Sequence, residues 1–418
     1  MSSVRLRRFR LDGHHAARFA AVVTMVVYAV AMSNFVRDQW SDDAEFTHRD
    51  FHNFYHAGER IRAGEEVYQH DEIPFLLTPI SAPAVVALSY VPEHAAFVIA
   101  AFVTMGLYVL ALTIAARACR AERRATLTSV FVACSMPSIW FAVYLGQLTG
   151  LYLVLLVPPL VWLVEPRAEA RGRGRSIAAG ILTALLCVKP QLALVVLVVA
   201  VVRRAWLMLA VTLVGVALLW ALSIPFLGVD AIVEWREQAT WCAEALEGAD
   251  STWWRQFTLY AFLRAVTSHA AMDMLAARTM YLSIVLPLGL ASLLAVRRAL
   301  APDERRFSMR AIAILVLATV ALNGYLFYYD GALLVIPWMV SFLCYESYAP
   351  LTRWLIVVVA IASRILAQTT PILEWGLIPL PGIVATLWLV IEIVDLTRGK
   401  RALAGLVPVA PPPVPAAV

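Results

Sequence analysis

Long apolar runs recur along almost the whole chain, and they constrain its fold more than any other feature. A helix needs about 20 mainly apolar residues to cross the hydrocarbon core of a bilayer, and runs near that length follow one another from residue 16 to residue 396. Hydrophobic residues make up 61% of the 418 positions and charged residues only 15%. These proportions exclude an ordinary soluble domain. The sequence therefore predicts an all-α polytopic membrane protein.

The runs predict about 10 to 12 transmembrane helices. They fall at residues 16–36, 95–116, 126–143, 148–164, 176–188, 192–202, 206–226, 275–296, 311–327, 332–346, 353–367 and 378–396. The two runs on either side of Lys189-Pro190 are short, so broken or tilted segments are expected there. The first run resembles a signal peptide at Ala29-Val30-Ala31, but its length and the runs that follow favour a retained helix.

Arginine clusters between the runs predict the orientation of the chain. They fall on alternate connections, as the positive-inside rule requires, at residues 5–10, 117–124, 167–175, 203–204, 297–310 and 398–401. We therefore expect these connections in the cytoplasm, and a first outer loop over 37–94 and a second over 227–274 on the opposite face. The net charge of +5 then reflects orientation and indicates no nucleic-acid partner.

We expect one integral membrane domain over residues 1–400 and a disordered, proline-rich cytoplasmic tail over 401–418. The five cysteines are scattered and indicate neither a disulfide framework nor a metal site. Tryptophans in the outer loops favour interfacial helices on the outer face, and they are Trp40, Trp235, Trp241, Trp253 and Trp254. The helical spacing of apolar and charged residues over 231–246 favours one such helix, with a surface loop as the alternative.

A polar and aromatic segment, His48 to Gly58, follows the first run directly. Asp50 lies near the start of a predicted helix, where the macrodipole keeps a carboxylate ionised, and an ionised carboxylate can accept a proton from an attacking hydroxyl. An ordinary N-terminal helix residue is the alternative. His48, His52 and His56 share one helical face, a geometry that can hold a divalent metal, but contacts to substrate, lipid or water are the favoured interpretation.

Lys189 is one of only two lysines, and it precedes a proline that interrupts an apolar run. A cation beside backbone groups released by that proline predicts a phosphate site near the membrane surface. A lysine that extends from a helix end to the interface is the alternative.

Two more polar sites lie on the outer side. Asp330 follows Tyr328-Tyr329, and it predicts either an anchor for a sugar hydroxyl or a cap for the next helix. Gln147 follows Gly146 in a tight turn between two runs, where it is either a substrate contact or a structural residue.

These motifs, in this order, resemble bacterial glycosyltransferase family 87 over roughly residues 20–345. The resemblance rests on Asp50-Phe51 with Tyr55-x-Ala57-Gly58, Ala63-Gly64-Glu65-Glu66-Val67-Tyr68, Leu77-Thr78-Pro79, Leu145-Gly146-Gln147-Leu148, Val188-Lys189-Pro190-Gln191 and Tyr328-Tyr329-Asp330. Thr78 departs from the aromatic residue that often precedes this proline in the family.

The resemblance implies a GT-C-type fold and inverting transfer of a sugar, typically mannose, from a polyprenyl-phosphate-linked donor to a lipid or glycan acceptor. Asp50 is then the expected general base, and Lys189 with Gln191 the donor phosphate site. The remaining expected substrate contacts are His52, Tyr55, His56, Gln147, Tyr329 and Asp330. No metal or other cofactor is expected, because phosphate is already a good leaving group.

The expected location is the bacterial inner (plasma) membrane, in contact with membrane lipids and with the active site facing the periplasm. A transporter or flippase for a lipid or polar solute is the main alternative, although its ionisable residues are expected near the bilayer midplane rather than at one face. An assembly scaffold without activity is the third possibility.

Overall fold

The computed structural model describes residues 22, 26, 30, 50–68, 75–165, 172–247, 256, 258–269, 273–299, 305–369 and 380–404. Of the first predicted run, only Val22, Val26 and Val30 are described, and they are helical and exposed. His48, Trp40, Trp253 and Trp254 lie outside the described residues, as does the tail beyond Ala404.

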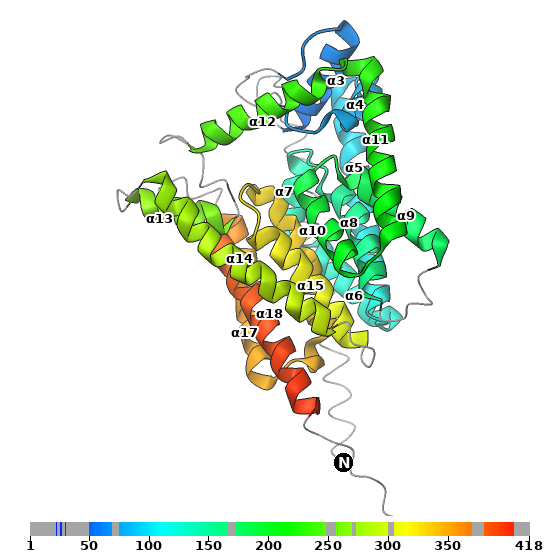
Figure 1. Cartoon of the computed structure of the whole chain (residues 1–418). Coiled ribbons are helices and arrows are strands. Elements are labelled where there is room, and N and C mark those ends of the chain that lie inside the picture. The colour runs from blue at the N-terminus through cyan, green and yellow to red at the C-terminus, as the bar shows by residue number, and fades with distance from the viewer. Residues whose placement is uncertain are drawn as a thin grey trace, which may run out of the picture.

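Throughout its described part the protein is all-helical (Figure 1), with one isolated antiparallel bridge between Gln256 and Phe327. The helices of the first half are α3 (Asp50–Ala63), α4 (Ala82–Leu88), α5 (Glu93–Ala118), α6 (Arg123–Cys134), α7 (Pro137–Tyr144), α8 (Thr149–Val164), α9 (Arg173–Leu186), α10 (Pro190–Val202), α11 (Trp206–Leu227) and α12 (Ala231–Glu247), with a 3₁₀ turn η1 (Pro79–Ser81). The second half has α13 (Leu259–His269), α14 (Met274–Ala299), α15 (Arg305–Ala321), α16 (Val335–Leu343), α17 (Pro350–Thr369) and α18 (Leu380–Ala404), with 3₁₀ segments η4 (Tyr328–Leu334) and η5 (Tyr345–Ser347).

Four helices in the described part are long and apolar enough to cross a membrane: α5, α11, α14 and α18 up to Arg398. The count becomes five if α6 and α7, which meet at an angle of 54°, are taken as one bent span. Each predicted run after the first coincides with one or two helices over most of its described length. Most of these helices are shorter apolar helices, such as α8 and α10. The structure therefore supports a membrane protein, and the figure of 10 to 12 spans stays a prediction.

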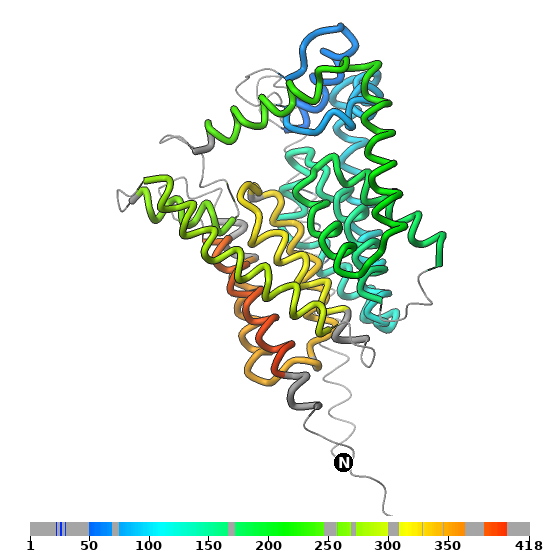
Figure 2. The backbone as a smooth tube through the Cα atoms, in the orientation of Figure 1, coloured from blue at the N-terminus to red at the C-terminus, as the bar shows by residue number. Residues whose placement is uncertain are grey.

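Helices of the two halves pack side by side (Figure 2), and α15 and α16 join them through one continuous apolar core. Glycine permits the closest helix contacts. A Cβ on Gly150 of α8 would come within 2.5 Å of the Thr104 carbonyl oxygen on α5, and one on Gly180 of α9 within 2.8 Å of the Met208 carbonyl oxygen on α11. Small residues at such crossings are typical of helices that associate in lipid, where close van der Waals contact drives packing.

The segments around α3, η1 and α4 form a separate layer over one end of the bundle (Figure 1). Their own apolar cluster includes Val67, Phe75 and Val85, and Trp235 of α12 packs against it. The Trp235 indole also donates a hydrogen bond to the carbonyl of Leu76 at 3.2 Å. The prediction of a helix over 231–246 is thus confirmed by α12, while its position at a membrane surface stays a prediction.

Two predicted boundaries differ from the structure. The run 311–327 is helical only to Ala321, because Asn323 accepts a hydrogen bond from the amide of Tyr325 at 2.9 Å and turns the chain before Phe327. This competition between an asparagine side chain and the helix is typical of turns. At the other end, α18 continues to Ala404, past the predicted start of the tail at residue 401.

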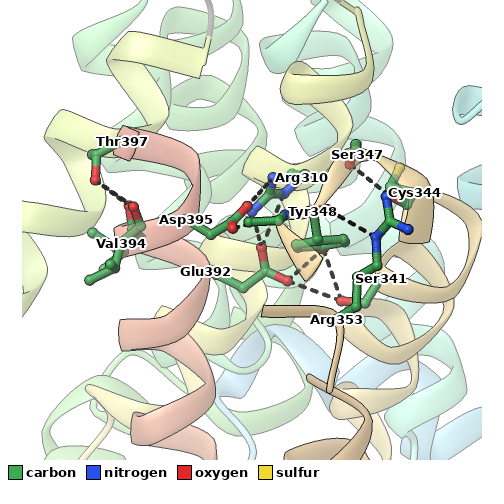
Figure 3. Close-up of polar contacts among 12 residues, drawn as sticks. Arg310, Ser341, Cys344, Ser347, Tyr348, Arg353, Glu392, Val394, Asp395 and Thr397 are labelled. Carbon is green, nitrogen blue, oxygen red and sulfur yellow. Dashed lines mark hydrogen bonds and ion pairs between the residues drawn. The ribbon is translucent and has the colours of Figure 1, made fainter. Parts of the chain in front are cut away.

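A buried network of charges connects α15, α18 and the α16–α17 connection (Figure 3). Arg310 is fully buried, pairs with Glu392 at 3.1 Å and with Asp395 at 2.9 Å, and its guanidinium lies 3.8 Å from the centre of the Tyr348 ring. The Tyr348 hydroxyl donates to Glu392 at 2.6 Å, and Ser341 donates to the same carboxylate at 3.0 Å. The cluster 297–310 predicted that Arg310 is a charge on the cytoplasmic surface. This prediction is wrong, because Arg310 lies in the interior.

Candidate functional site

Four short segments that carry the predicted site residues are joined by packing and by the Gln147–Asp50 and Lys189–Asp330 bonds, at the end of the bundle nearest α3 and α4. They are the start of α3, the turn between α7 and α8, the turn between α9 and α10, and η4. Leu148 and Val188, one from each turn, pack against the apolar cluster of the α3 and α4 layer. The sequence motifs thus form one region, although they are separated by up to 280 residues from Asp50 to Asp330 (330 − 50).

Asp50 begins α3, is partly buried, and accepts a hydrogen bond from the side-chain amide of Gln147. The next residue also holds α3 against the α7–α8 turn, since the amide of Phe51 donates to the carbonyl of Leu145 at 3.1 Å. A carboxylate at the N-terminus of a helix is stabilised in its ionised form by the macrodipole. The structure therefore brings Asp50 and Gln147 together and holds the carboxylate against the α7–α8 turn.

The second polar pair joins the α9–α10 turn to η4. Lys189 Nζ lies 2.5 Å from Asp330 Oδ1, and the side chains are 12% and 1% exposed. The other carboxylate oxygen, Oδ2, accepts a hydrogen bond from the amide of Phe327 at 3.3 Å. Asp330 thus caps the first turn of η4 and also binds Lys189, so both of its oxygens already have partners in the chain. The predicted cap was for a helix that starts at Gly331, whereas η4 starts at Tyr328 and Asp330 bonds back to the amide that precedes it. The bond to Lys189 was not among the predicted alternatives.

Aromatic rings surround the ammonium group of Lys189. Its Nζ lies 5.2 Å from the ring centre of Tyr152 and 5.7 Å from that of Tyr329, distances at which a ring face attracts a cation. Tyr329 in turn stacks on Phe327 with ring centres 5.6 Å apart. The ammonium group therefore lies between a carboxylate and two aromatic rings in a largely buried position. Its three donors allow further bonds beside the one to Asp330.

The helix that follows Lys189 favours an anion at the same place. Pro190 is the first residue of α10, where the missing amide hydrogen costs no helical hydrogen bond. The first amides of a helix have no partner within it, and they create a positive end that binds phosphate groups. Gln191 is exposed in this first turn, next to Lys189. The lysine, the helix terminus and the amide side chain are groups that could hold an anion.

Thr78 holds the α9–α10 turn in place from outside the bundle. Its hydroxyl lies 3.3 Å from the carbonyl oxygen of Cys187 and 3.4 Å from that of Val188, and its amide donates to Val188 at 3.5 Å. Both carbonyls follow Leu186, the last residue of α9, and Thr78 provides donors to them from another segment. The departure of Thr78 from the resembled motif thus has a structural role beside Lys189.

Three predicted substrate contacts lie on another side of α3, facing the start of α5. His52 Nδ1 is 2.7 Å from Glu93, and His56 Nδ1 is 2.9 Å from Glu59. Tyr55 is buried, and its hydroxyl donates to the carbonyl of Val91 at 3.0 Å. The two histidine rings meet edge to face, 4.0 Å apart. The structure does not bring these residues to the Lys189 pair.

No cluster of three or more His, Cys, Asp or Glu side chains that could hold a metal ion occurs within the described ranges. His52 and His56 instead pair with carboxylates, as described above, and His48 lies outside these ranges.

Sequence reasoning missed Tyr152 and the bonding role of Thr78. Tyr152 lies in α8 among apolar neighbours, and nothing in its local pattern distinguishes it from a core tyrosine. Only the fold shows that its ring faces the lysine. Thr78 carried a usable signal, since a hydroxyl beside a proline in an otherwise apolar stretch is a polar group that needs a partner when buried.

Comparison with known protein families matches residues 75–323 to glycosyltransferase family 87. No curated protein matches the chain. The matched span contains Gln147, Lys189 and Gln191, and it begins after Asp50 and ends before Asp330. It covers more than half of the 418 residues, and it confirms the family that the ordered motifs predicted. The chain belongs to glycosyltransferase family 87, and it is a glycosyltransferase built on apolar helices.

Proposed function

We propose that this glycosyltransferase moves a sugar, mannose being the expected one, from a polyprenyl-phosphate-linked donor to a lipid or glycan acceptor, with inversion at the anomeric carbon. One observation carries the proposal. Lys189 lies at the start of α10 with donors to spare, in the same region as a carboxylate held at the start of α3. A lysine at a helix N-terminus suits a phosphate, and a positioned carboxylate suits a hydroxyl that must lose its proton.

The donor phosphate would bind between Lys189 and the first turn of α10, with Gln191 able to add a hydrogen bond. Asp330 would orient the ammonium group by one hydrogen bond and leave its other two donors for the phosphate. A lipid-linked donor brings its phosphate to headgroup depth while its isoprenoid chain stays in hydrocarbon. The apolar helices around this end of the bundle provide that setting.

In the proposed reaction the acceptor oxygen attacks the anomeric carbon from the face opposite the phosphate. Asp50 takes the hydroxyl proton as the new carbon–oxygen bond forms. The bond between the anomeric carbon and the phosphate oxygen breaks, and its electron pair leaves with polyprenyl phosphate. Lys189 stabilises the negative charge that develops on that oxygen. One displacement on the opposite face gives inversion.

We further propose that the site faces the periplasm in a bacterial inner membrane. The support is the alternation of arginine clusters with the site-bearing turns, since basic connections stay on the cytoplasmic side. One end of the bundle carries the turns with Gln147 and Lys189 and the start of η4. The arginine cluster 117–124 lies in the connection from α5 to α6, at the other end of the bundle.

One observation favours the alternative of a transporter, namely the charge network of Arg310, Glu392 and Asp395 inside the bundle. Ionisable residues within a membrane protein often mark a transport path. These three are at most 6% exposed and pair with one another, which instead supports a structural role. Reconstituted liposomes separate the two functions, since movement of solute without covalent change would favour the transporter.

The test of the proposed function is transfer by Asp50→Asn. We expect the variant to bind donor and to express like the wild type, but to transfer no sugar from radiolabelled polyprenyl-phosphate mannose to a bacterial membrane lipid extract. Asparagine keeps the shape of the side chain but cannot accept the proton. Turnover at the wild-type rate would refute the assignment.

A further inference from the structure

The proposed reaction does not by itself require the hydrogen bond that Gln147 donates to Asp50. Gln147 is a buried side chain, 5% exposed, and it directs its amide at the carboxylate from a turn 97 residues away in sequence. A buried amide on a membrane helix end normally bonds to nearby backbone. This one bonds to the expected general base.

The backbone of the turn leaves Gln147 little freedom to move. Gly146 has φ +70°, its amide donates to the carbonyl of Val143 at 3.0 Å, and the amide of Gln147 donates to that of Ala142 at 2.8 Å. This pair of bonds is the Schellman motif, which ends a helix with a left-handed residue. The position of Gln147 is therefore fixed by the end of α7.

The same turn also fixes α3. A Cβ on Gly146 would lie 2.4 Å from Cβ of Phe51, so only glycine allows α3 to approach this closely. The amide of Phe51 bonds to Leu145, and the Phe51 ring packs edge to face on Phe97 with centres 5.3 Å apart. Base and turn are thus joined by a backbone bond, a side-chain bond and a close contact.

We propose that Gln147 is the positioning residue for Asp50: it holds the carboxylate in the orientation that accepts the acceptor proton. This inference rests on the proposed function of Asp50 and assigns Gln147 a role other than contact with substrate. A neutral amide suits the role. It orients the carboxylate through one oxygen without the charge of a lysine or arginine, which would weaken the base, and a carboxylate can accept about four hydrogen bonds in all.

Two substitutions at position 147 test the inference in the full-length enzyme, with radiolabelled polyprenyl-phosphate mannose and a bacterial membrane lipid extract. Gln147→Met keeps the length and volume of the side chain but removes the donor. We expect kcat to fall about 10²-fold, the loss typical of a small misplacement of a reacting group, with the KM for donor within about twofold of wild type. The thermal unfolding midpoint should stay close to the wild-type value.

Gln147→Glu places a second carboxylate against Asp50, and two facing carboxylates share a proton. We expect the acidic limb of the kcat–pH profile to move to higher pH, which loss of packing alone would not cause. A kcat for Gln147→Met within threefold of wild type would overturn the inference. If Gln147→Met does not fold, an unmoved acidic limb in Gln147→Glu overturns it instead.

Asp50→Asn, measured beside both variants, separates the two proposals. If Asp50→Asn is inactive while Gln147→Met is fully active, Asp50 remains the base and the positioning role of Gln147 fails. If Asp50→Asn turns over at the wild-type rate, the proposed function of Asp50 itself fails.

Discussion

Two buried groups of charges in the described part of this protein use different cations, and they lie at opposite ends of α15 and α16. The Lys189–Asp330 pair lies where η4 follows α15, and the Arg310 network lies near the beginning of α15 and just beyond the end of α16. Lys189 keeps 12% of its side chain exposed, whereas Arg310 and Glu392 are 0% exposed. The Lys189–Asp330 pair is therefore accessible to a ligand, and the Arg310 network is enclosed.

The difference follows from the chemistry of the two cations. Arginine has five donors in a rigid fork, and at position 310 two carboxylates and an aromatic ring occupy it. Lysine is a compact charge with three donors that can rotate, and Asp330 occupies one of them. An arginine enclosed by two carboxylates and a ring suits a framework. A partly exposed lysine with donors beyond the one that bonds to Asp330 suits the binding of a phosphate. The variants below test that division.

The largest effect is expected from Arg310→Met. This change leaves the carboxylates of Glu392 and Asp395 buried without their cation, and breaking a buried pair in this way costs about 3–5 kcal/mol. We expect a strong fall in the yield of folded protein and in the thermal unfolding midpoint, measured on detergent-purified protein.

The matched control removes all three charges together, as Arg310→Met with Glu392→Gln and Asp395→Asn. Removing all three charges leaves no uncompensated buried charge, which is the main cost of removing one partner alone. We expect this triple variant to recover much of the stability and to transfer sugar at a rate near that of wild type. An unchanged unfolding midpoint in Arg310→Met alone would contradict the framework role.

Neutralising the Lys189–Asp330 pair should instead preserve stability and reduce activity. Lys189→Met with Asp330→Asn leaves no buried charge without a partner, so the fold should persist, but the phosphate loses its cation. We expect kcat to fall by about 10²–10³-fold, the cost of removing one donor to a developing charge. A steady-state transfer assay with a parallel unfolding curve measures both. A folded double variant with full activity would remove Lys189 from the reaction.

A smaller effect is expected at the turn that joins base and bundle. Gly146→Ala puts a side chain in a left-handed conformation and within 2.4 Å of Phe51, a strain of roughly 1–3 kcal/mol. We expect α3 to shift and kcat to fall about 10-fold. Gly172→Ala, where a Cβ would meet nothing within 4 Å, is the control and should be silent in the same assay. Equal behaviour of the two variants would contradict the contact.

The smallest effect is expected from Thr78→Val, which keeps the shape of the side chain but loses its hydroxyl. The bonds to Cys187 and Val188 are long, so the loss should be about 0.5–1.5 kcal/mol of stability and a rise of a few fold in the KM for donor. Thr78→Ser keeps the hydroxyl and should restore the wild-type KM. If valine and serine behave alike, the hydroxyl does not hold the Lys189 turn.

Apolar periodicity predicted the helices well because each run must satisfy its own backbone hydrogen bonds in lipid. It failed where a side chain competes locally, as at Asn323, and where burial depends on a distant partner, as for Arg310. A signal for that network was present in the acidic residues Glu392 and Asp395 within an apolar run, since a charge there needs a counter-ion.

The candidate site was predictable in its residues but not in its pairs. Asp50, Gln147, Lys189 and Asp330 were all expected at one face of the protein. Nothing local joins Asp50 to Gln147 over 97 residues or Lys189 to Asp330 over 141 residues, because such pairing is decided by how helices pack. The same packing places His52 beside Glu93 rather than beside the lysine.

The most direct test of the account is a structure of the full-length protein with a non-hydrolysable polyprenyl-phosphate sugar analogue bound. We expect a phosphate oxygen about 3 Å from Lys189 Nζ, the distance of a charge-assisted hydrogen bond, and the anomeric carbon on the side of Asp50. A phosphate bound away from Lys189, with the Lys189–Asp330 pair undisturbed and solvent at Asp50, would contradict it.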